Sequence, residues 1–172
     1  MCLHSFAGLS VAKSGLSSFR VNGIRPLKIF CSIQINAAPN KYPNLRTSFA
    51  HGGMLGIANY GRRIQGFDGR PDIFEKLQDP RKTLGHRNLY FDTLVHDSYT
   101  LDLLKKRVGA SQIIMGLDDP YPLGEIEGVG TSYPGRVLDY AIKTKILTKQ
   151  EGKDIWHKNV LNWLGMKKEE FK

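Results

Sequence analysis

Short apolar runs alternate with amphipathic stretches over the second half of the chain. The segment LRTSFA at 45–50 has the mixed polarity of a short strand, while LYFDTLV at 89–95 and SQIIMGL at 111–117 carry the bulky and branched side chains that strands favour. Helical spacing appears further along the chain after each of the latter two. The pattern therefore predicts strands separated by helices.

A helix is predicted directly after the strand at 89–95. Asp97 or Ser98 can cap its first turn, and Gly109 can end it. Between these ends, apolar side chains recur at the spacing of one buried helix face: Leu101, Leu104 and Val108. Strand and helix thus follow each other as in a βαβ unit.

Two more helical segments follow the strand at 111–117. The first covers PGRVLDYAIKTKIL at 134–147, and the second begins at Thr148, where Glu151 three residues later makes a capping box. Gly165 ends this second helix. Its expected core side chains are Ile155, Trp156, Val160, Leu161, Trp163 and Leu164.

The order of these elements predicts an α/β fold. Parallel strands joined by helices cross over right-handedly and form a parallel sheet, with the loops gathered at the strand ends. A chain of 172 residues can enclose one compact core. A complete (β/α)8 barrel takes about 250 residues, so we expect only part of such a barrel.

In two stretches the apolar residues do not recur at the spacing of a helix or a strand. Residues 1–41 are predicted to be an irregular basic lead-in with one short strand at KIFCSIQI, and they are either disordered, a non-native chain start or an organellar transit peptide. Residues 54–79 are predicted to be irregular, because four glycines and a proline interrupt any long helix. Long loops of this kind often carry function.

The net charge of +9 is concentrated in the amino-terminal part of the chain. Residues 1–67 contain eight Lys or Arg and no Asp or Glu, whereas 68–172 contain seventeen basic and sixteen acidic side chains. A protein that binds nucleic acid usually gathers basic residues on a folded face. The balanced second part therefore argues against a nucleic-acid partner.

Cysteine content and hydropathy limit the compartment. Cys2 and Cys31 are the only cysteines, which excludes a disulfide framework and a cysteine-rich metal site and favours a reducing compartment. No apolar run reaches the roughly 18 residues of a membrane helix. We expect a soluble, cytoplasmic protein without a membrane partner, or an organellar one if the lead-in directs import.

Two predicted strand ends carry side chains that could do chemistry. The run IIMGLDDPYPLGE at 113–125 passes from apolar residues to Asp118, and a carboxylate at the end of a buried strand needs a cation or hydrogen bonds to offset its desolvation. Metal ligands and catalytic acids lie at this end of the strands in (β/α)8 barrels. His51, followed by two glycines, ends the strand at 45–50, and an imidazole can accept a proton near neutral pH.

These groups also have structural explanations. Asp118 could cap a turn in the sequence Asp-Asp-Pro, and a histidine beside two glycines is often structural. His96, at the end of the strand at 89–95, could support the site, although a structural role beside the predicted cap is favoured. The residues alone leave these alternatives open.

Five short segments occur in one order: FAHGG at 49–53, GR at 61–62, GRPD at 69–72, LYFDTLVHD at 89–97 and GLDDPYPLGE at 116–125. Together they resemble the metal-dependent decarboxylases of the amidohydrolase superfamily, most closely the 2-amino-3-carboxymuconate-6-semialdehyde decarboxylases of tryptophan catabolism, the kynurenine pathway. The likeness begins near Tyr42 and continues to NWLGMKKEEF at 162–171. It implies that 42–172 form the carboxyl-terminal part of a TIM barrel, about its last three βα units.

The resemblance implies a zinc-dependent carboxy-lyase that acts on a small dicarboxylate semialdehyde. In such an enzyme Asp118 would be a zinc ligand, and His51 would be the catalytic general base that takes a proton from zinc-bound water. Arg62 and Arg70 would bind substrate carboxylates across the interface of a homodimer. Tyr121 would line the substrate pocket.

The sequence departs from this family at the metal site. The family takes further zinc ligands from a His-x-His pair and from another histidine, and no His-x-His occurs here. Asp119 stands where many members have an aromatic residue and adds a second negative charge. Catalytic zinc normally needs three protein ligands, so we expect this chain alone to bind zinc weakly and to have little activity. A non-catalytic fragment that dimerises with a full-length relative is the alternative.

Overall fold

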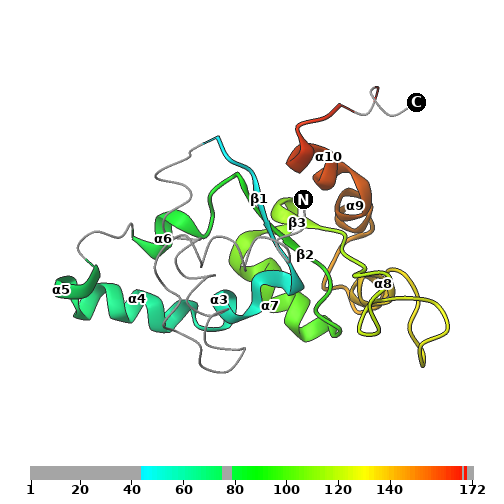
Figure 1. The fold of residues 1–172 in the computed structure, drawn as a ribbon, viewed down its shortest axis with the longest axis horizontal. Coiled ribbons are helices and arrows are strands. Elements are labelled where there is room, and N and C mark those ends of the chain that lie inside the picture. Colours follow the sequence, from blue (N-terminus) through cyan, green and yellow to red (C-terminus); the bar gives the residue numbers. More distant parts are fainter. Residues whose placement is uncertain (1–43, 75–78, 168, 170–172) are drawn as a thin grey trace.

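A three-stranded parallel sheet forms the centre of the computed structural model, which describes residues 44–74, 79–167 and 169 (Figure 1). The strands lie in the order of the sequence: β1 (Thr47–Phe49), β2 (Leu89–Asp92) and β3 (Ile113–Ile114). Both strand pairs are parallel, as predicted. The strand predicted at KIFCSIQI, together with the rest of the lead-in 1–41, lies outside the described residues.

The middle strand β2 is covered on both faces. All four of its residues are buried, whereas a half-exposed strand would alternate between buried and exposed positions. Phe91 lies opposite Phe49 on one side and Ile113 on the other, and the two phenylalanine rings stack with centroids 5.5 Å apart. The run LYFD is apolar along most of its length because a parallel strand of this kind meets a helix or loop on each face.

Helix α7 (Ser98–Val108) follows β2 and packs against the sheet. Its N-cap is Asp97, whose carboxylate accepts a 2.9 Å hydrogen bond from the backbone N–H of Thr100. The residues predicted to face the core are buried: Leu101, Leu104 and Val108. The predicted cap and the predicted packing face of this helix are both confirmed.

Three helical segments and a π turn follow β3 and lie on the right in Figure 1: α8 (Arg136–Lys143), α9 (Lys149–Lys153), the π turn η4 (Asp154–Lys158) and α10 (Asn159–Leu164). The capping box of Thr148 and Glu151 is present at the start of α9. Gly165, in the left-handed region at φ 73°, ends α10. These features agree with the sequence prediction.

The predicted core face of the last helical segment is wrong in part. Ile155 is fully buried, but Trp156 is 46% exposed and Leu164 is 43% exposed. A π turn adds a residue to one helical turn, so the face that follows it is rotated relative to a regular helix. Asn159 is turned inward instead, and its amide donates to the carbonyl oxygens of Ala110 and Ile113 at 2.9 and 2.8 Å.

The prediction that residues 54–79 are irregular is wrong for 54–74, and 75–78 lie outside the described residues. The segment contains α3 (Met54–Ala58), α4 (Tyr60–Gly69) and α5 (Pro71–Phe74), and α6 (Pro80–Thr83) follows. An internal glycine destabilises a helix by only about 0.5–1 kcal/mol. Burying an aliphatic side chain such as Ile57, which is 1% exposed, contributes about 1.5–3 kcal/mol. The burial of α3 side chains therefore outweighs the low helix propensity of the glycines.

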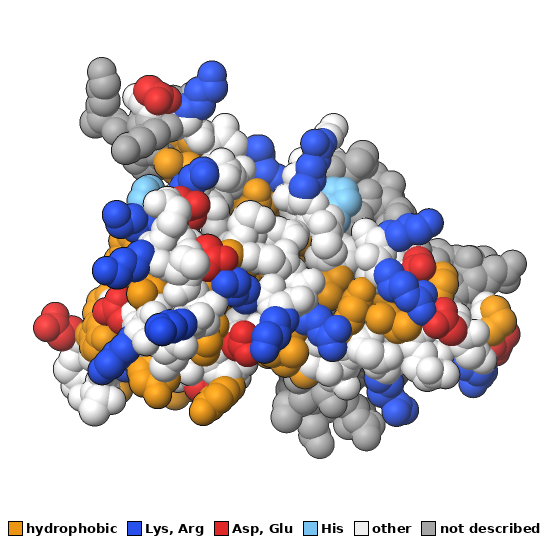
Figure 2. All heavy atoms as spheres, turned by 180° about the vertical axis from the view of Figure 1, so that it is seen from behind, with side chains coloured by type: hydrophobic (Ala, Val, Ile, Leu, Met, Phe, Trp, Pro, Cys, Tyr) orange, Lys and Arg blue, Asp and Glu red, His pale blue; other side chains and the backbone are white. Residues whose placement is uncertain are grey.

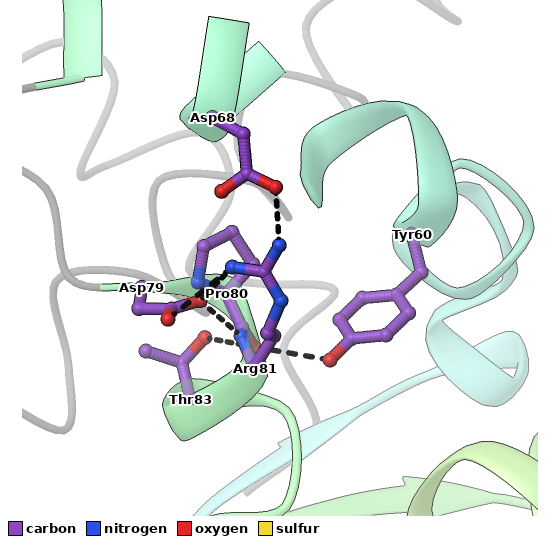
Figure 3. A network of polar contacts seen from close by, with 6 residues as sticks. All are labelled: Tyr60, Asp68, Asp79, Pro80, Arg81 and Thr83. Atoms are coloured by element: carbon purple, nitrogen blue, oxygen red, sulfur yellow. Dashed lines mark hydrogen bonds and ion pairs between the residues drawn. The ribbon is translucent and has the colours of Figure 1, made fainter. Parts of the chain in front are cut away.

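A polar network joins α4 to α6 (Figure 3), which lie on the left in Figure 1. The guanidinium of Arg81 pairs with the carboxylates of Asp68 and Asp79, and Asp79 also caps α6 by accepting a 2.9 Å hydrogen bond from the backbone N–H of Arg81. The hydroxyl of Tyr60 donates to the carbonyl oxygen of Pro80 at 3.4 Å. The charged groups are partly exposed, so each pair contributes little to stability, and the network links the last turn of α4 to the start of α6.

Charged side chains of both signs are scattered over the face of the molecule drawn in Figure 2. Figure 2 shows Lys and Arg side chains spread among Asp and Glu side chains, rather than gathered in one patch, on the face behind that of Figure 1.

None of the helices in the described part of the chain has the length and apolarity needed to cross a lipid bilayer.

The capping box of α9 gives a prediction about stability against pH. The Glu151 carboxylate accepts hydrogen bonds from the backbone N–H of Thr148 at 2.7 Å and from Nζ of Lys105 at 2.9 Å. Burial raises the pKa of Glu151, but these hydrogen bonds outweigh burial and hold it below the ordinary 4.5. A depressed pKa in the folded state stabilises the protein above the unfolded-state pKa, and this contribution is lost as pH falls through the folded-state pKa.

The Glu151→Gln variant should therefore lose about 0.5–1 kcal/mol of unfolding free energy at about pH 7 and almost none at about pH 3. Urea unfolding at the two pH values measures the difference. Glu127→Gln, at an exposed loop position, serves as the control and should change little at either pH. An equal loss for Glu151→Gln at both pH values would contradict the assignment.

Candidate functional site

Loops from all three strands meet at the carboxyl edge of the sheet. His51 follows β1, the segment 93–97 follows β2, and the segment 115–125 follows β3. Parallel strands end on the same edge, so residues far apart in the sequence become neighbours there. This edge is where a barrel of this type carries its ligand site.

A cavity of about 670 Å3 opens at this edge. Its polar groups come from His51, His96, Asp118 and Tyr121, and aliphatic side chains of the same loops supply most of the remaining wall. A mainly apolar wall with a few convergent polar groups is typical of a small-molecule site, and the volume falls in the usual range of about 300–1,000 Å3. The structure thus brings together three of the residues singled out from the sequence: His51, Asp118 and Tyr121.

Backbone strain gathers at this cavity. Four non-glycine residues in the described part of the chain have positive φ, and three of them line the cavity: His51 at 55°, His96 at 66° and Asp118 at 56°. A left-handed backbone destabilises a residue with a Cβ by roughly 1–2 kcal/mol. Strain of this kind persists where the surroundings impose it, and it concentrates at ligand sites.

The turn that carries His51 is packed tightly against β2. Gly52 and Gly53 continue the left-handed conformation with φ of 61° and 56°. A Cβ on Gly52 would lie 2.6 Å from Cγ1 of Val95, and a Cβ on Gly53 would lie 2.9 Å from Cδ1 of Phe91. Both positions therefore require glycine, because β2 and the residues after it approach the turn so closely.

Asp118 lies in a closed loop rather than at a strand end. Strand β3 ends at Ile114, and the Asp118 side chain is half-buried, which corrects the prediction that it ends a buried strand. The loop closes through hydrogen bonds from the backbone N–H of Tyr121 to the Asp118 carbonyl at 2.8 Å and from the N–H of Glu125 to the Leu117 carbonyl at 2.9 Å. These bonds hold Asp118 and Tyr121 on one wall of the cavity.

A buried carboxylate anchors the far end of this loop. Glu125 is 1% exposed and accepts hydrogen bonds from the backbone N–H groups of Gly135 and Val137, both at 3.1 Å. Burial raises its pKa, and the two N–H donors oppose that effect. The interaction ties the wall of the cavity to the start of α8.

Asp92, at the end of β2, is a polar group that reasoning from the sequence missed. Its side chain is buried, at 9% exposure, and burial raises its pKa. Asp92 is therefore the carboxylate that ends a buried strand and needs hydrogen bonds to offset its desolvation, as was predicted for Asp118. The feature of the sequence that could have identified it is the single carboxylate in the apolar run LYFD. His96 was assigned mainly a structural role, and the structure places it on the cavity wall.

The two arginines predicted to bind substrate lie outside this cavity. Arg62 is on α4 and Arg70 follows it, and both side chains are exposed. Arg70 donates from Nε and from a terminal nitrogen to the two oxygens of Asp72 at 2.9 and 2.7 Å, the paired geometry with which guanidinium binds carboxylates. Neither arginine reaches the cavity of its own chain.

The described residues do not fit a complete metal centre. Within 44–74, 79–167 and 169, no three side chains of His, Cys, Asp or Glu lie together in a way that could hold a metal ion. Catalytic zinc normally takes three protein ligands. Asp118 could supply one ligand, but the others would have to come from outside the described residues.

Two decarboxylases are similar to the chain in sequence, while no protein-family model matches it. It is 31% identical over 138 residues to the 2-amino-3-carboxymuconate-6-semialdehyde decarboxylase of Dictyostelium discoideum, covering 79% of this chain and 35% of that protein. It is 34% identical over 136 residues to the Caenorhabditis elegans enzyme of the same name, covering 78% of this chain and 31% of that one. The chain thus spans about a third of the length of the curated relatives it matches.

A solved structure is similar in fold. The dihydroxybenzoic acid decarboxylase of Polaromonas, solved with bound manganese and the inhibitor 2-nitroresorcinol, superposes with a TM-score of 0.60 over 86% of this chain and 42% of that one. The sequence identity is 16%, so this likeness concerns the fold alone. Together with the parallel sheet, it confirms the partial (β/α)8 barrel predicted from the sequence.

The close packing of the His51 turn gives a prediction. Gly52→Ala should lower the free energy of unfolding by about 2–4 kcal/mol, because the new methyl group overlaps Val95 and the backbone is left-handed. Gly61→Ala is the matched control, since a Cβ added there would meet no atom within 4 Å and the residue sits in α4, where alanine should be neutral or stabilise by about 0.5–1 kcal/mol. Urea unfolding of both variants measures this, and equal effects would show that the turn is not packed as described.

Proposed function

The chain belongs to the amidohydrolase family that includes the 2-amino-3-carboxymuconate-6-semialdehyde decarboxylases, and we propose that it supplies the carboxyl-terminal part of a decarboxylase site. The reaction would be the non-oxidative loss of carbon dioxide from 2-amino-3-carboxymuconate semialdehyde, with residues 42–172 as the barrel portion and 1–41 as a lead-in. The observation that carries this proposal is the single cavity shared by His51 and Asp118, which lie on loops after different strands.

His51 would transfer a proton in this reaction. When the carbon–carbon bond to the carboxylate breaks, its electron pair enters the conjugated system, and the same carbon must then gain a proton. An imidazole is suited to exchange that proton near neutral pH. The constrained left-handed turn would limit the directions in which the His51 ring can point.

Asp118 would contribute one ligand to a divalent metal, zinc in this proposal. The shortage of ligands among the described residues means that this metal would be shared with residues outside the described part. Tyr121, 59% exposed on the cavity wall, would contact the substrate.

Arg62 and Arg70 would bind substrate carboxylates in the site of a second subunit. Both are exposed and lie outside the cavity of their own chain, and Arg70 already holds the carboxylate of Asp72 through two hydrogen bonds. A substrate carboxylate could replace Asp72, because that ion pair is exposed to solvent on both sides. This assignment makes a homodimer part of the proposal.

A non-catalytic interaction fragment is the second candidate function. The observation that favours it is the incomplete set of metal ligands among the described residues. Such a fragment would alter the activity of a full-length relative when the two are mixed. An inert fragment would not.

A chimera tests the enzymatic proposal. Residues 42–172 would replace the matching part of the Dictyostelium relative, and decarboxylation and bound metal would be measured together. We expect activity in the chimera, a fall in kcat of about 100-fold or more for His51→Gln, and loss of metal and activity for Asp118→Asn. Asp119→Asn should keep the metal.

Two results would contradict this proposal. A folded, metal-loaded chimera without activity would favour the interaction fragment. Stoichiometric zinc and turnover in the 172-residue chain alone would show that its ligand set is complete.

A further inference from the structure

The buried carboxylate of Asp92 lies between the two loops that carry His51 and Asp118. It stands at the carboxyl end of the middle strand β2 and is 9% exposed. Its Oδ1 atom accepts hydrogen bonds from the backbone N–H of Gly52 at 2.9 Å and from the N–H of Leu94 at 3.1 Å. One oxygen atom thus connects the loop after β1 to the loop after β2.

The loop after β1 offers this carboxylate a suitable surface. His51, Gly52 and Gly53 are consecutive left-handed residues, and successive backbone N–H groups in turns of this kind form a concavity that binds anions. The N–H groups of His51 and Gly52 both interact with the Asp92 carboxylate. A side chain of the same protein therefore occupies the place of the anion.

Asp92 also contacts the segment that leads to Asp118. A Cβ on Gly116 would lie 2.6 Å from Cβ of Asp92 and 2.9 Å from its Oδ2 atom. The backbone two residues before Asp118 therefore passes directly against this carboxyl group. Asp92 itself is not part of the cavity wall, so any effect on the cavity is exerted through the backbone of the neighbouring loops.

We propose that Asp92 is the positioning residue of this site, whose buried carboxylate holds the left-handed turn at His51 and thereby fixes the imidazole against the cavity. The term positioning rests on the proposed function, because it assumes that His51 acts on the substrate. The structural part of the proposal, that the carboxylate restrains the turn, can be measured without substrate.

The surroundings of Asp92 act on its pKa in two opposite directions. Burial raises its pKa, while the backbone N–H groups of Gly52, His51 and Leu94 and the charge of the His51 ring oppose that effect. A carboxylate is also a stronger acceptor for these N–H groups than a neutral amide. Replacing it by alanine removes the acceptor, whereas asparagine keeps an oxygen atom and loses the charge.

Hydrogen exchange and NMR test the proposal in the 172-residue chain. The exchange rate of the Gly52 amide is compared with that of the Leu101 amide in the core of α7, and the His51 ring signal is assigned by its absence in His51→Gln. Asp92→Ala should speed exchange at Gly52 relative to Leu101 by about tenfold or more and shift the His51 ring signal. Asp92→Asn should give a smaller increase, about threefold, and it serves as the readout if the alanine variant does not fold.

Gln112→Ala is the matched control. Gln112 is a buried polar residue at the opposite edge of the sheet, and its amide donates to the carbonyl oxygens of His86 and Leu89, both at 2.7 Å. Its loss should destabilise the fold without changing the Gly52 to Leu101 ratio or the His51 signal. The proposal is overturned if that ratio changes less than twofold in both Asp92 variants, or if Gln112→Ala changes it equally.

The same variants in the chimera separate this proposal from the proposed function. Asp92→Asn should lower kcat there and leave KM nearly unchanged, whereas Gln112→Ala should change neither. An inactive parent chimera would contradict the decarboxylase proposal. The role of Asp92 in holding the turn would then be decided by the exchange rate of the Gly52 amide alone. Faster exchange of the Gly52 amide in Asp92→Asn, together with an unchanged kcat of the chimera, would show that Asp92 holds the turn but does not serve catalysis.

Discussion

Parallel pairing of three short strands is the constraint on which the rest of the structure depends. Because β1, β2 and β3 run in one direction, the loops after them must meet at one edge, although they are far apart in the sequence. The middle strand β2 is buried along its whole length and lies between the other two strands at this edge. Because of that alignment, His51, His96 and Asp118 line a common cavity.

Three carboxyl groups at this edge show how environment separates structural from chemical roles. Asp92 and Glu125 are buried, and each accepts hydrogen bonds from backbone N–H groups, which offset the desolvation of the carboxyl group. Asp118 is half-buried and lines the cavity. The buried pair therefore holds the loops, whereas the third carboxyl group lies where a ligand could meet it.

Most of the fold could be predicted from the sequence, because its signals are local. The cap at Asp97, the capping box at Thr148 and the apolar runs of the strands each depend on residues within one turn or one strand. The helices of 54–74 and the rotated face after the π turn could not be predicted, because tertiary packing of Ile57 and Asn159 decides them.

The candidate site divides in the same way. His51, Asp118 and Tyr121 were found by motif, and all three line one cavity in the structure. Asp92 lies within the segment LYFDTLVHD, but its role could not be predicted from that segment, because it depends on the N–H of Gly52, 40 residues away in the sequence, and on the close approach of Gly116. Only the folded arrangement of the strands brings these groups together.

The central claim, that His51 and Asp118 face one cavity, is tested most directly by adding Mn2+ to the 172-residue chain and following the histidine ring signals by NMR. The paramagnetic ion broadens signals close to it. Weak binding of Mn2+ at the Asp118 carboxylate should broaden the His51 and His96 signals at a lower Mn2+ concentration than that of His86, at the opposite edge of the sheet, and Asp118→Asn should remove this difference. Equal broadening of all three signals, or an unchanged pattern in Asp118→Asn, would contradict it.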